Sequence, residues 1–272
     1  MTESTTIQEK AAASAFSKQA PLFDELYNSN SIVRYKRKRV REHVERFLSP
    51  GSSILELNAG TGEDAVYFAG KGYTVHATDI SQGMREVFIQ KIKENKYSDK
   101  VSFELCSFTQ LENLQQKGPY DLVFSNFAGL NCTSELETTL KTIPALLKPG
   151  GYATLVVLPQ FCLWEFLLLF KGRFWTAFRR FSGSKGTKAR VEGEYFRCWY
   201  YNPSYIRRHT KEDFKVVSVE GLCTLVPPSY IENFAEKRPG LFRFLEKKEN
   251  RWKSNWPWRS VGDYYIITLQ KK

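Results

Sequence analysis

The chain has 272 residues, of which 42% are hydrophobic, 25% are charged and 15% are aromatic. These values are typical of a globular protein with a substantial core, and they exclude a disordered or low-complexity chain. The formal net charge of +11 indicates a basic surface, which attracts nucleic acid, anionic membranes or anionic substrates without selecting among them.

Cysteine usage and the N-terminal sequence indicate a cytoplasmic protein. The five cysteines are widely spaced and include no C-x-x-C pair, so neither a disulfide framework nor a metal site is predicted. The opening "MTESTTIQEK" lacks the apolar stretch of a signal peptide. The apolar run 152–170 is interrupted by Pro159, Gln160 and Glu165, so we expect a strand followed by a separate helix rather than a membrane span.

Helical and strand patterns alternate along most of the chain. The first 20 residues are rich in Ser, Thr, Ala and Gln, and we expect them to be mobile. Helical spacing, caps and Pro-Gly stops then predict helices over 32–48, 63–71, 82–96, 135–147, 161–181 and 239–248, with a short one from Pro203. A flexible "SGSKGTK" loop follows 161–181. Short apolar runs predict strands over 54–57, 73–77, 101–105, 120–125, 152–158, 214–219 and 264–269. Such alternation predicts a parallel sheet with helices on both faces.

A glycine-rich turn joins the first predicted strand to its helix, in "SSILELNAGTGEDAVYFAGKG" (52–72). The pattern G-x-G-x-x-A from Gly60, with Asp79 at the end of the next strand, suits a cofactor that carries a ribose. NAD and S-adenosylmethionine (SAM) both meet this description. Glu56 favours SAM, because a carboxylate at the end of the strand would repel a pyrophosphate but suits an ammonium group.

The wider pattern E-x-N-x-G-T-G resembles the E/D-x-G-x-G-x-G motif of SAM-dependent methyltransferases. "YDLVFSNFAGLN" and "LLKPGGYATLVV" follow at distances similar to the fourth strand, the Pro-Gly-Gly turn and the fifth strand of that family. The likeness covers 32–158, resumes over 201–221 and 264–269, and points to the small-molecule branch that contains ubiquinone-type methyltransferases. It implies an α/β, Rossmann-like, doubly wound sheet of seven strands, mostly parallel with the last strand antiparallel, with helical cap insertions and SAM as cofactor.

The resemblance also implies that the chain forms a single methyltransferase domain with several parts. We expect an N-terminal segment over 1–31, a SAM-binding core over 32–158, and late core strands within 200–222 and 263–272. Cap and substrate insertions are expected over 159–199 and 223–262.

Cofactor residues follow from the same resemblance. Asp79 is expected to bind the ribose hydroxyls, although an Asx turn is an alternative, and Ile80 to flank the adenine. No acid follows the third strand, where the family places an Asp against the adenine amine; Ser107 and Phe108 stand there instead. The expected set is Arg37, Glu56, Asn58, Gly60, Gly62, Asp79, Ile80, Met84, Ser107, Phe108 and Asn126.

Two members of this set need comment. Asn58 replaces a glycine of the motif, and we expect it to keep the turn because Asn tolerates positive φ, with its amide bonding a neighbouring backbone group. Arg37 lies on the apolar face of its predicted helix. It reaches either the SAM carboxylate or, as a snorkelling side chain, the solvent.

Candidate residues for the acceptor side are mostly aromatic. The expected substrate pocket contains Phe127, Asn131, Trp164, Phe166 and Tyr201. Glu165 is either an acid in the first turn of a helix or a buried general base with a raised pKa. His209 is a second catalytic candidate, with a surface position as its alternative. Because the methyl group of SAM is already activated, the protein mainly aligns the acceptor and excludes water.

We therefore expect a SAM-dependent methyltransferase that acts on a hydrophobic or aromatic small molecule or a lipid-like acceptor, with peripheral membrane contact as a further option. A nucleic-acid methyltransferase is one alternative, because "RYKRKRVR" and "RWKSNWPWR" are basic, although such clusters are most often solvated faces. The sequence "SNFAGL" after the fourth strand disfavours this alternative, since nucleic-acid amino-methyltransferases carry an Asn/Asp-Pro-Pro-Tyr type motif there. A non-catalytic SAM-binding or partner-binding module is the third hypothesis.

Overall fold

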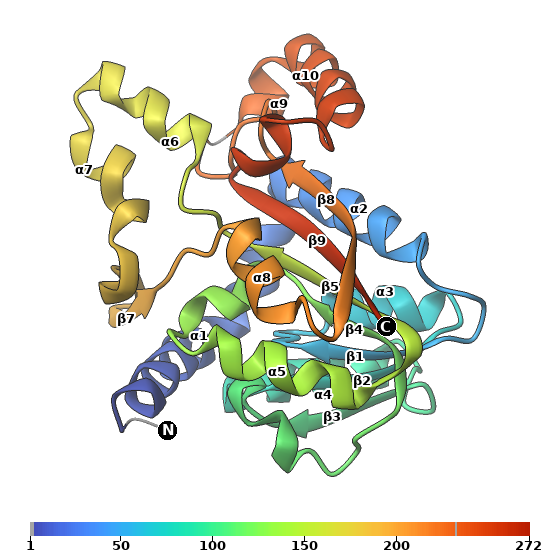
Figure 1. Cartoon of the computed structure of the whole chain (residues 1–272). Coiled ribbons are helices and arrows are strands. Elements are labelled where there is room, and N and C mark those ends of the chain that lie inside the picture. The colour runs from blue at the N-terminus through green and yellow to red at the C-terminus, as the bar shows by residue number, and fades with distance from the viewer. Residues whose placement is uncertain (1–2, 232) are drawn as a thin grey trace.

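The computed structural model describes residues 3–231 and 233–272, and a twisted sheet of seven strands forms its centre (Figure 1). The strand order is β3-β2-β1-β4-β5-β9-β8. Neighbours from β3 to β5 are parallel, whereas β9 is antiparallel to both β5 and β8. The predicted fold class is confirmed. The strands are β1 (Ser53–Leu57), β2 (Thr74–Asp79), β3 (Val101–Leu105), β4 (Tyr120–Ser125), β5 (Leu147–Val157), β8 (Phe214–Leu222) and β9 (Tyr264–Lys271).

Helices cover both faces of this sheet and create two hydrophobic cores. On one face, α2 (Ser31–Glu45), α3 (Glu63–Gly70), α4 (Gln82–Glu94) and α10 (Pro239–Trp252) contribute apolar side chains. On the other, α5 (Leu136–Leu146), α8 (Pro203–Thr210) and the 3₁₀ turn η1 (Phe108–Asn113) do so. In α5 the buried side chains Leu136, Leu140 and Ile143 recur at helical spacing, so the sequence period selects the face that packs.

The N-terminal segment forms a long helix, α1 (Glu3–Asn28), so the expectation of a mobile stretch is wrong. Its alanines Ala12, Ala15 and Ala20 are buried, and alanine is the strongest helix former. α1 crosses the carboxyl ends of the central strands. Its Ser17 bonds Ser81 after β2 at 2.7 Å, and its Asp24 accepts from Thr61 after β1 at 2.7 Å.

A hairpin that the sequence did not predict holds α1 from outside. It consists of β6 (Thr187–Val191) and β7 (Glu194–Cys198), in and after the expected flexible loop. Phe196 of β7 packs against Phe16 of α1 with ring centroids 5.7 Å apart, and Glu194 pairs with Lys18. The helix is therefore clamped between the sheet edge and the hairpin.

The expected helix over 161–181 is broken into short pieces. They are α6 (Leu163–Leu167), η3 (Leu168–Lys171), α7 (Phe174–Phe178) and η4 (Arg179–Phe181). Gly172, at φ 70°, ends the first pair in the left-handed conformation that glycine adopts without strain. Of the helices in the described residues, none combines the length and the apolar character that crossing a bilayer requires.

Three of the six cations in the basic cluster of α2, Lys36, Arg37 and Arg39, are buried, which corrects the expectation of a solvated face for these three, whereas Arg34 and Lys38 are exposed. Arg39 lies 3.5 Å from both Glu220 and Glu249, and Arg41 donates to Asp64 at 2.6 Å. These acids lie on other elements, and their charges offset the cost of burying the cations. The remaining elements are α9 (Phe234–Lys237) and the short turns η2 (Gly129–Cys132), η5 (Gly183–Lys185) and η6 (Trp258–Ser260).

Candidate active site

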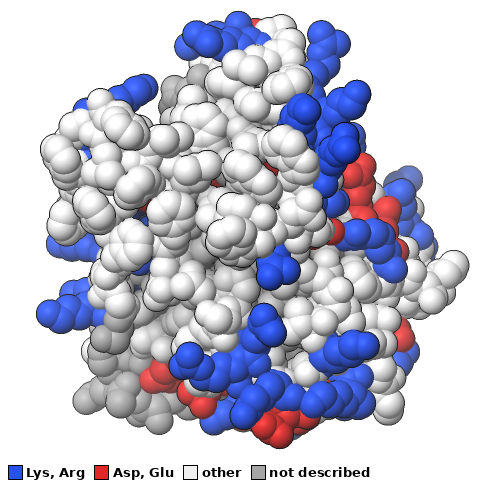
Figure 2. Space-filling model, turned by 45° about the horizontal axis from the view of Figure 1, so that its top comes forward, with Lys and Arg blue, Asp and Glu red and all other residues white. Residues whose placement is uncertain are grey.

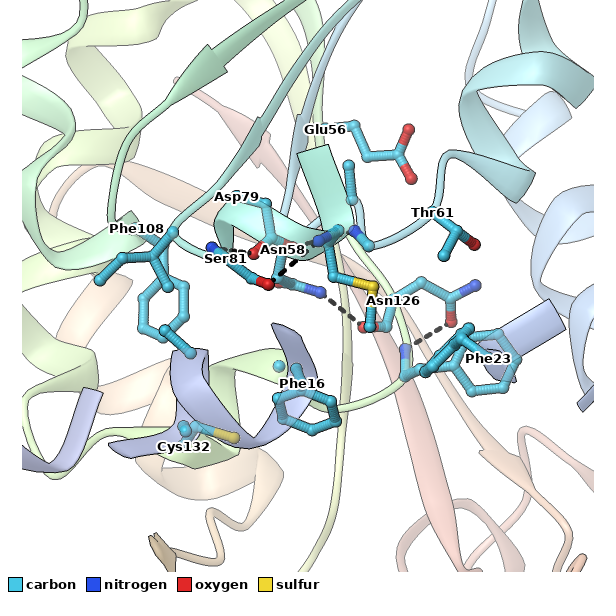
Figure 3. Close-up of a pocket in the computed structure, with 18 of the residues that line it drawn as sticks. Phe16, Phe23, Glu56, Asn58, Thr61, Asp79, Ser81, Phe108, Asn126 and Cys132 are labelled. Carbon is cyan, nitrogen blue, oxygen red and sulfur yellow. Dashed lines mark hydrogen bonds between the residues drawn. The ribbon is translucent and has the colours of Figure 1, made fainter. Parts of the chain in front are cut away.

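A cavity lies at the carboxyl ends of β1, β2 and β4, with α1 across it (Figure 3). In a parallel α/β sheet this edge is where ligands bind, because the strand order reverses there and the loops diverge. Ten of the eleven expected cofactor residues line the cavity: Arg37, Glu56, Asn58, Gly60, Asp79, Ile80, Met84, Ser107, Phe108 and Asn126.

Gly62 is the exception, and its role is in the backbone. It caps the N-terminus of α3 at φ 83°, and a Cβ there would lie 2.6 Å from the ring of Phe88. The position requires glycine for conformation and for close packing rather than for contact with the cavity.

Asn58 has the conformation that the sequence predicted. Its φ is 47°, its amide nitrogen donates to the carbonyl of Asn126 at 2.9 Å, and its amide oxygen accepts from Ser125 at 2.6 Å. A Cβ on Gly129 would lie 2.3 Å from the amide carbon of Asn58. The Asn side chain therefore connects the loop after β1 to the end of β4, which a glycine could not do.

Asp79 forms the Asx turn that was one of its two alternatives and also bonds the glycine loop. One carboxylate oxygen accepts from the backbone N–H of Ser81 at 2.9 Å, as in an Asx turn, and the other accepts from the N–H of Gly60 at 2.9 Å. Desolvation raises the pKa of Asp79, while these backbone donors oppose the shift. A carboxylate has about four acceptor sites, so two remain for a pair of hydroxyls.

Glu56 is a buried acid with unused hydrogen-bonding capacity. Its Oε2 has no hydrogen-bond partner among the described residues, although it lies in the wall of the cavity. Burial, and then the charge of Asp64, raise its pKa well above the usual range, which Arg41 partly opposes. An unpaired buried carboxylate is costly, so the site fits a cationic ligand group.

Arg37 is buried, which excludes the snorkelling alternative. Its side chain is 9% exposed, and its guanidinium lies 5.4 Å from the centroid of the Phe127 ring and 3.5 Å from Glu63. A snorkelling side chain would keep its charged head in water. The Arg37 Nε has no partner among the described residues, so the guanidinium retains a donor in the cavity wall.

Glu9 of α1 supplies the acid that the sequence lacks after β3. It lines the cavity and is 7% exposed. The hydroxyls of Ser107 and Thr109 each donate to its carboxylate at 2.9 Å. Glu9 and Ser107 are 98 residues apart in the chain, and nothing in the local sequence relates them.

The turn after β4 holds an aromatic side chain in a strained conformation. Phe127 and Ala128 have φ of 48° and 60°, which is rare outside glycine, asparagine and aspartate. Asn126 supports the turn, because it donates to Asp64 at 2.7 Å and accepts from the Phe127 N–H at 2.8 Å. Strain of this kind persists where the surroundings over-determine it, and it is enriched at functional sites.

Apolar side chains form the part of the wall that α1 contributes. Figure 3 shows Phe16 and Phe23 on the helix, facing the loops that carry Asn58 and Asn126. Phe127 and Cys132 complete this wall. The cavity thus has polar groups along the strand ends and an apolar side beneath the helix.

Sequence comparison shows which known proteins the core of the chain resembles. Residues 54–151 match a methyltransferase domain. The chain is 30% identical over 141 residues to demethylmenaquinone methyltransferase of Leptospira interrogans, which covers 50% of this chain and 55% of that protein. Residues 54–151 therefore carry a methyltransferase domain, in agreement with the resemblance of the sequence to SAM-dependent methyltransferases.

A further relative is a much longer protein, of which this chain matches a small part. A polyketide synthase-nonribosomal peptide synthetase of Pyricularia grisea, pyiS, is 35% identical over 165 residues, which is 56% of this chain and 4% of the synthetase. The chain therefore spans about half of one of these curated relatives and a small part of the other.

Solved structures share its fold. The 1,6-didemethyltoxoflavin-N1-methyltransferase of Burkholderia thailandensis gives a TM-score of 0.58 at 15% identity, covering 98% of this chain and 90% of that one. The geranyl diphosphate C-methyltransferase of Streptomyces coelicolor gives 0.55 at 13% identity, covering 87% and 79%.

Four of the five expected substrate residues lie outside the cavity, and among the five only Phe127 lines it. Asn131 is fully buried and connects backbone groups, donating to the carbonyl of Trp199 and accepting from the N–H of Leu158. The Tyr201 hydroxyl donates to the carbonyl of Thr133 in the core. Trp164 and Phe166 belong to the α6 segment, outside the lining residues.

Neither expected catalytic residue lines the cavity. Glu165 does lie in the first turn of α6, as one alternative held, but it accepts from Arg179 at 2.6 and 2.9 Å and from Arg180 at 2.6 Å. Burial would raise its pKa, yet these hydrogen bonds lower it, so the general-base reading is wrong. His209 lies 3.4 Å from Glu137 on α5 and its ring packs on Tyr205, away from the cavity.

Proposed function

We propose that the protein transfers the methyl group of SAM to an apolar or aromatic small molecule or a lipid-like acceptor. The observation that carries the proposal is the division of one cavity into a polar edge and an apolar wall. The polar edge suits the cofactor, and the aromatic wall of α1 and Phe127 suits a hydrophobic acceptor.

The polar edge divides by chemistry into three subsites. The two free acceptor sites of Asp79 fit the ribose hydroxyls. Glu9, held by Ser107 and Thr109, fits the adenine amine, which donates hydrogen bonds. Glu56 and Arg37 fit the ammonium and carboxylate of the methionine moiety, because each keeps an unpartnered polar atom.

When bound, SAM supplies a methyl group already activated by the sulfonium. The residues of the chain then align the acceptor and exclude water, which is the main demand of an in-line displacement. Phe16, Phe23 and Phe127 provide the water-excluding surface. Among the described lining residues there is no histidine, and desolvation raises the pKa of Cys132, so its thiol keeps its proton. Of the lining carboxylates, Glu9, Glu56 and Asp79 are assigned to the cofactor. The other two are paired with cations, Asp64 with Arg41 and Glu63 with Lys91. We therefore propose an acceptor that loses its proton readily or has none to lose.

The relatives support a small-molecule acceptor. The names of three of them specify demethylmenaquinone, 1,6-didemethyltoxoflavin and geranyl diphosphate as the molecules concerned. For this chain, the aromatic wall favours the hydrophobic members of that range, and we propose that the segments 159–199 and 223–262 act as caps around the core.

Isothermal titration calorimetry with S-adenosylhomocysteine (SAH) tests the cofactor site. We expect saturable binding to the wild type and a loss of roughly tenfold or more in affinity for Asp79→Ala, because a pair of charge-assisted hydrogen bonds is removed. Asp99→Ala, at an exposed position, is the matched control. Absence of SAH binding to the folded wild type would favour the non-catalytic partner-binding alternative.

Transfer of tritium from methyl-labelled SAM tests the acceptor class. The protein is incubated with hydroquinones and phenols of increasing apolar chain length, and in parallel with total RNA. We expect label in the organic phase, with turnover that rises with apolar character. Label confined to the RNA would support the nucleic-acid alternative instead.

A further inference from the structure

Residues 166–191 combine positive charge with apolar side chains in an unusual way. This stretch contains seven cations, Lys171, Arg173, Arg179, Arg180, Lys185, Lys188 and Arg190, and no Asp or Glu. Among the described residues, none of the exposed Lys171, Arg173 and Lys185 has an acidic partner within salt-bridge distance. The stretch therefore carries only positive charges, whereas many charged side chains elsewhere in the chain form ion pairs.

Six large apolar side chains of the same stretch point into solvent. We call Leu167, Phe170, Phe174, Trp175, Phe178 and Phe181 the aromatic face; their exposed fractions range from 41% to 85%. Single exposed apolar residues are common, but a cluster of this size marks an interaction surface. In Figure 2 the segment forms the rounded, mostly uncharged lobe at the left, with Lys and Arg atoms at its margin.

Ion pairs fix the base of this lobe while leaving its outer side free. Arg179 and Arg180 both bind Glu165, and Arg180 also donates to Asp263 at 2.7 Å, next to β9. These contacts hold α6 and η4 together, so α7 between them is presented outward. A preorganised apolar surface loses less conformational entropy when it binds than a mobile loop does.

We infer that the aromatic face inserts into the headgroup region of an anionic lipid bilayer. Phe and Trp side chains enter the boundary between headgroups and acyl chains, and adjacent Lys and Arg side chains bind anionic headgroups. Two features favour a bilayer over nucleic acid: aliphatic Leu167 belongs to the surface, and the lobe is convex (Figure 2). Single strands instead bind in basic grooves where bases stack on aromatic rings.

The location of the lobe connects lipid contact with the cavity. The stretch 166–191 ends with β6, and the β6–β7 hairpin packs on α1, which lies across the cavity (Figure 1). A bilayer bound at the aromatic face would hold the hairpin and α1 close to a store of apolar molecules. This last step rests on the proposed function, whereas lipid binding itself does not.

Vesicle co-sedimentation of the 272-residue protein, without SAM or acceptor, tests the inference. The vesicles contain phosphatidylcholine alone or phosphatidylcholine with phosphatidylglycerol. We expect binding to the mixed vesicles, weak binding to phosphatidylcholine alone, and a roughly tenfold or greater loss in the double variant Phe170→Ser, Trp175→Ser. The matched control is Phe244→Ser, Trp256→Ser, which replaces two exposed aromatics outside the segment and should bind as the wild type does.

Fluorescence distinguishes insertion from electrostatic adsorption. Brominated lipids should quench the wild type, and Trp175→Phe should still sediment with vesicles but lose most of that quenching. The inference is overturned if the wild type does not bind phosphatidylglycerol vesicles, if the double variant binds equally well, or if RNA rather than lipid is retained by the aromatic face. SAH titration of the same samples shows separately whether the cofactor site is intact.

Discussion

Replacement of Glu9 by glutamine changes the proposed adenine subsite with little change in shape. In the structure this carboxylate accepts hydroxyl hydrogen bonds from Ser107 and Thr109. With about four acceptor sites on a carboxylate, roughly two remain for the amine of adenine. In S-inosylhomocysteine a carbonyl oxygen replaces that amine. This oxygen only accepts hydrogen bonds, so it cannot bond the Glu9 carboxylate, which is also an acceptor.

The magnitude follows from the value of a hydrogen bond to a charged group. Such a bond contributes about 1.5–3 kcal/mol, so the wild type should prefer SAH over S-inosylhomocysteine by roughly 10- to 150-fold in Kd. In Glu9→Gln the new side-chain amide can rotate to donate to the carbonyl or accept from the amine. The preference of this variant should therefore fall to within about threefold.

Titration calorimetry of both ligands with both proteins measures this ratio. Glu25→Gln is the control, because it makes the same chemical change at an exposed position of α1. Thermal melting of the free proteins shows whether α1 still docks. If the wild type binds both ligands equally, or if Glu9→Gln keeps the full preference while remaining folded, Glu9 does not bind the adenine.

Other predictions concern charge and backbone. Burial raises the pKa of Glu56, and the ligand ammonium favours its ionised form, so SAH binding should release a proton and SAH affinity should increase as the pH rises toward that pKa. Calorimetry in buffers of different ionisation enthalpy should detect this released proton in the wild type and not in Glu56→Gln. Equal binding enthalpies in all buffers would contradict the prediction. Glu165→Gln should lower the free energy of unfolding in urea by about 3–5 kcal/mol and leave SAH affinity unchanged; lost binding without lost stability would return Glu165 to the site. Asn58→Gly should cost about 1–3 kcal/mol, because Ser125 and the Asn126 carbonyl lose their partner; a variant as stable as the wild type in urea would refute the bridging role. Burial would raise the pKa of Glu220, but hydrogen bonds from His43, Arg46 and Lys253 lower it. The ionised carboxylate therefore stabilises the folded state above its ordinary pKa of about 4.3, and this contribution is lost as the pH falls below that value. Glu220→Gln should show a flatter dependence of unfolding free energy on pH, and an unchanged profile would argue against the linkage.

The cofactor edge was predictable because its residues follow one another at fixed places. Glu56, Asn58, Gly60 and Asp79 each lie at the end of a strand or in the turn after it, and parallel strands bring these ends together. The left-handed conformation of Asn58 also follows from its own chemistry.

The acceptor side was not predictable by the same reasoning. Trp164 and Phe166 were assigned to the pocket because aromatic side chains are frequent in pockets, yet an apolar segment gives no indication of which cavity it faces. Glu165 is open to two interpretations from the sequence, and Arg179 and Arg180 decide between them. They follow 14 and 15 residues later, and in one continuous helix they would lie about 20 Å away, so the contact depends on the break in the segment. Because Glu165 pairs with these two arginines, it does not act as a general base.

By itself the sequence determined the seven strands and the glycine loop, since apolar period, turn residues and strand-end acids are local properties, and the resemblance of its motifs to SAM-dependent methyltransferases implied the cofactor class. Only the tertiary structure placed α1 across the cavity, brought Glu9 to Ser107 and buried the cations of α2 against Glu220 and Glu249. These contacts join residues distant in the chain, and their energy comes from excluding water and neutralising charge between packed elements. A local sequence pattern cannot identify such a distant partner, because many acids and helices elsewhere in the chain are equally compatible with the pattern. Which of them makes the contact depends on how the elements pack in the folded core.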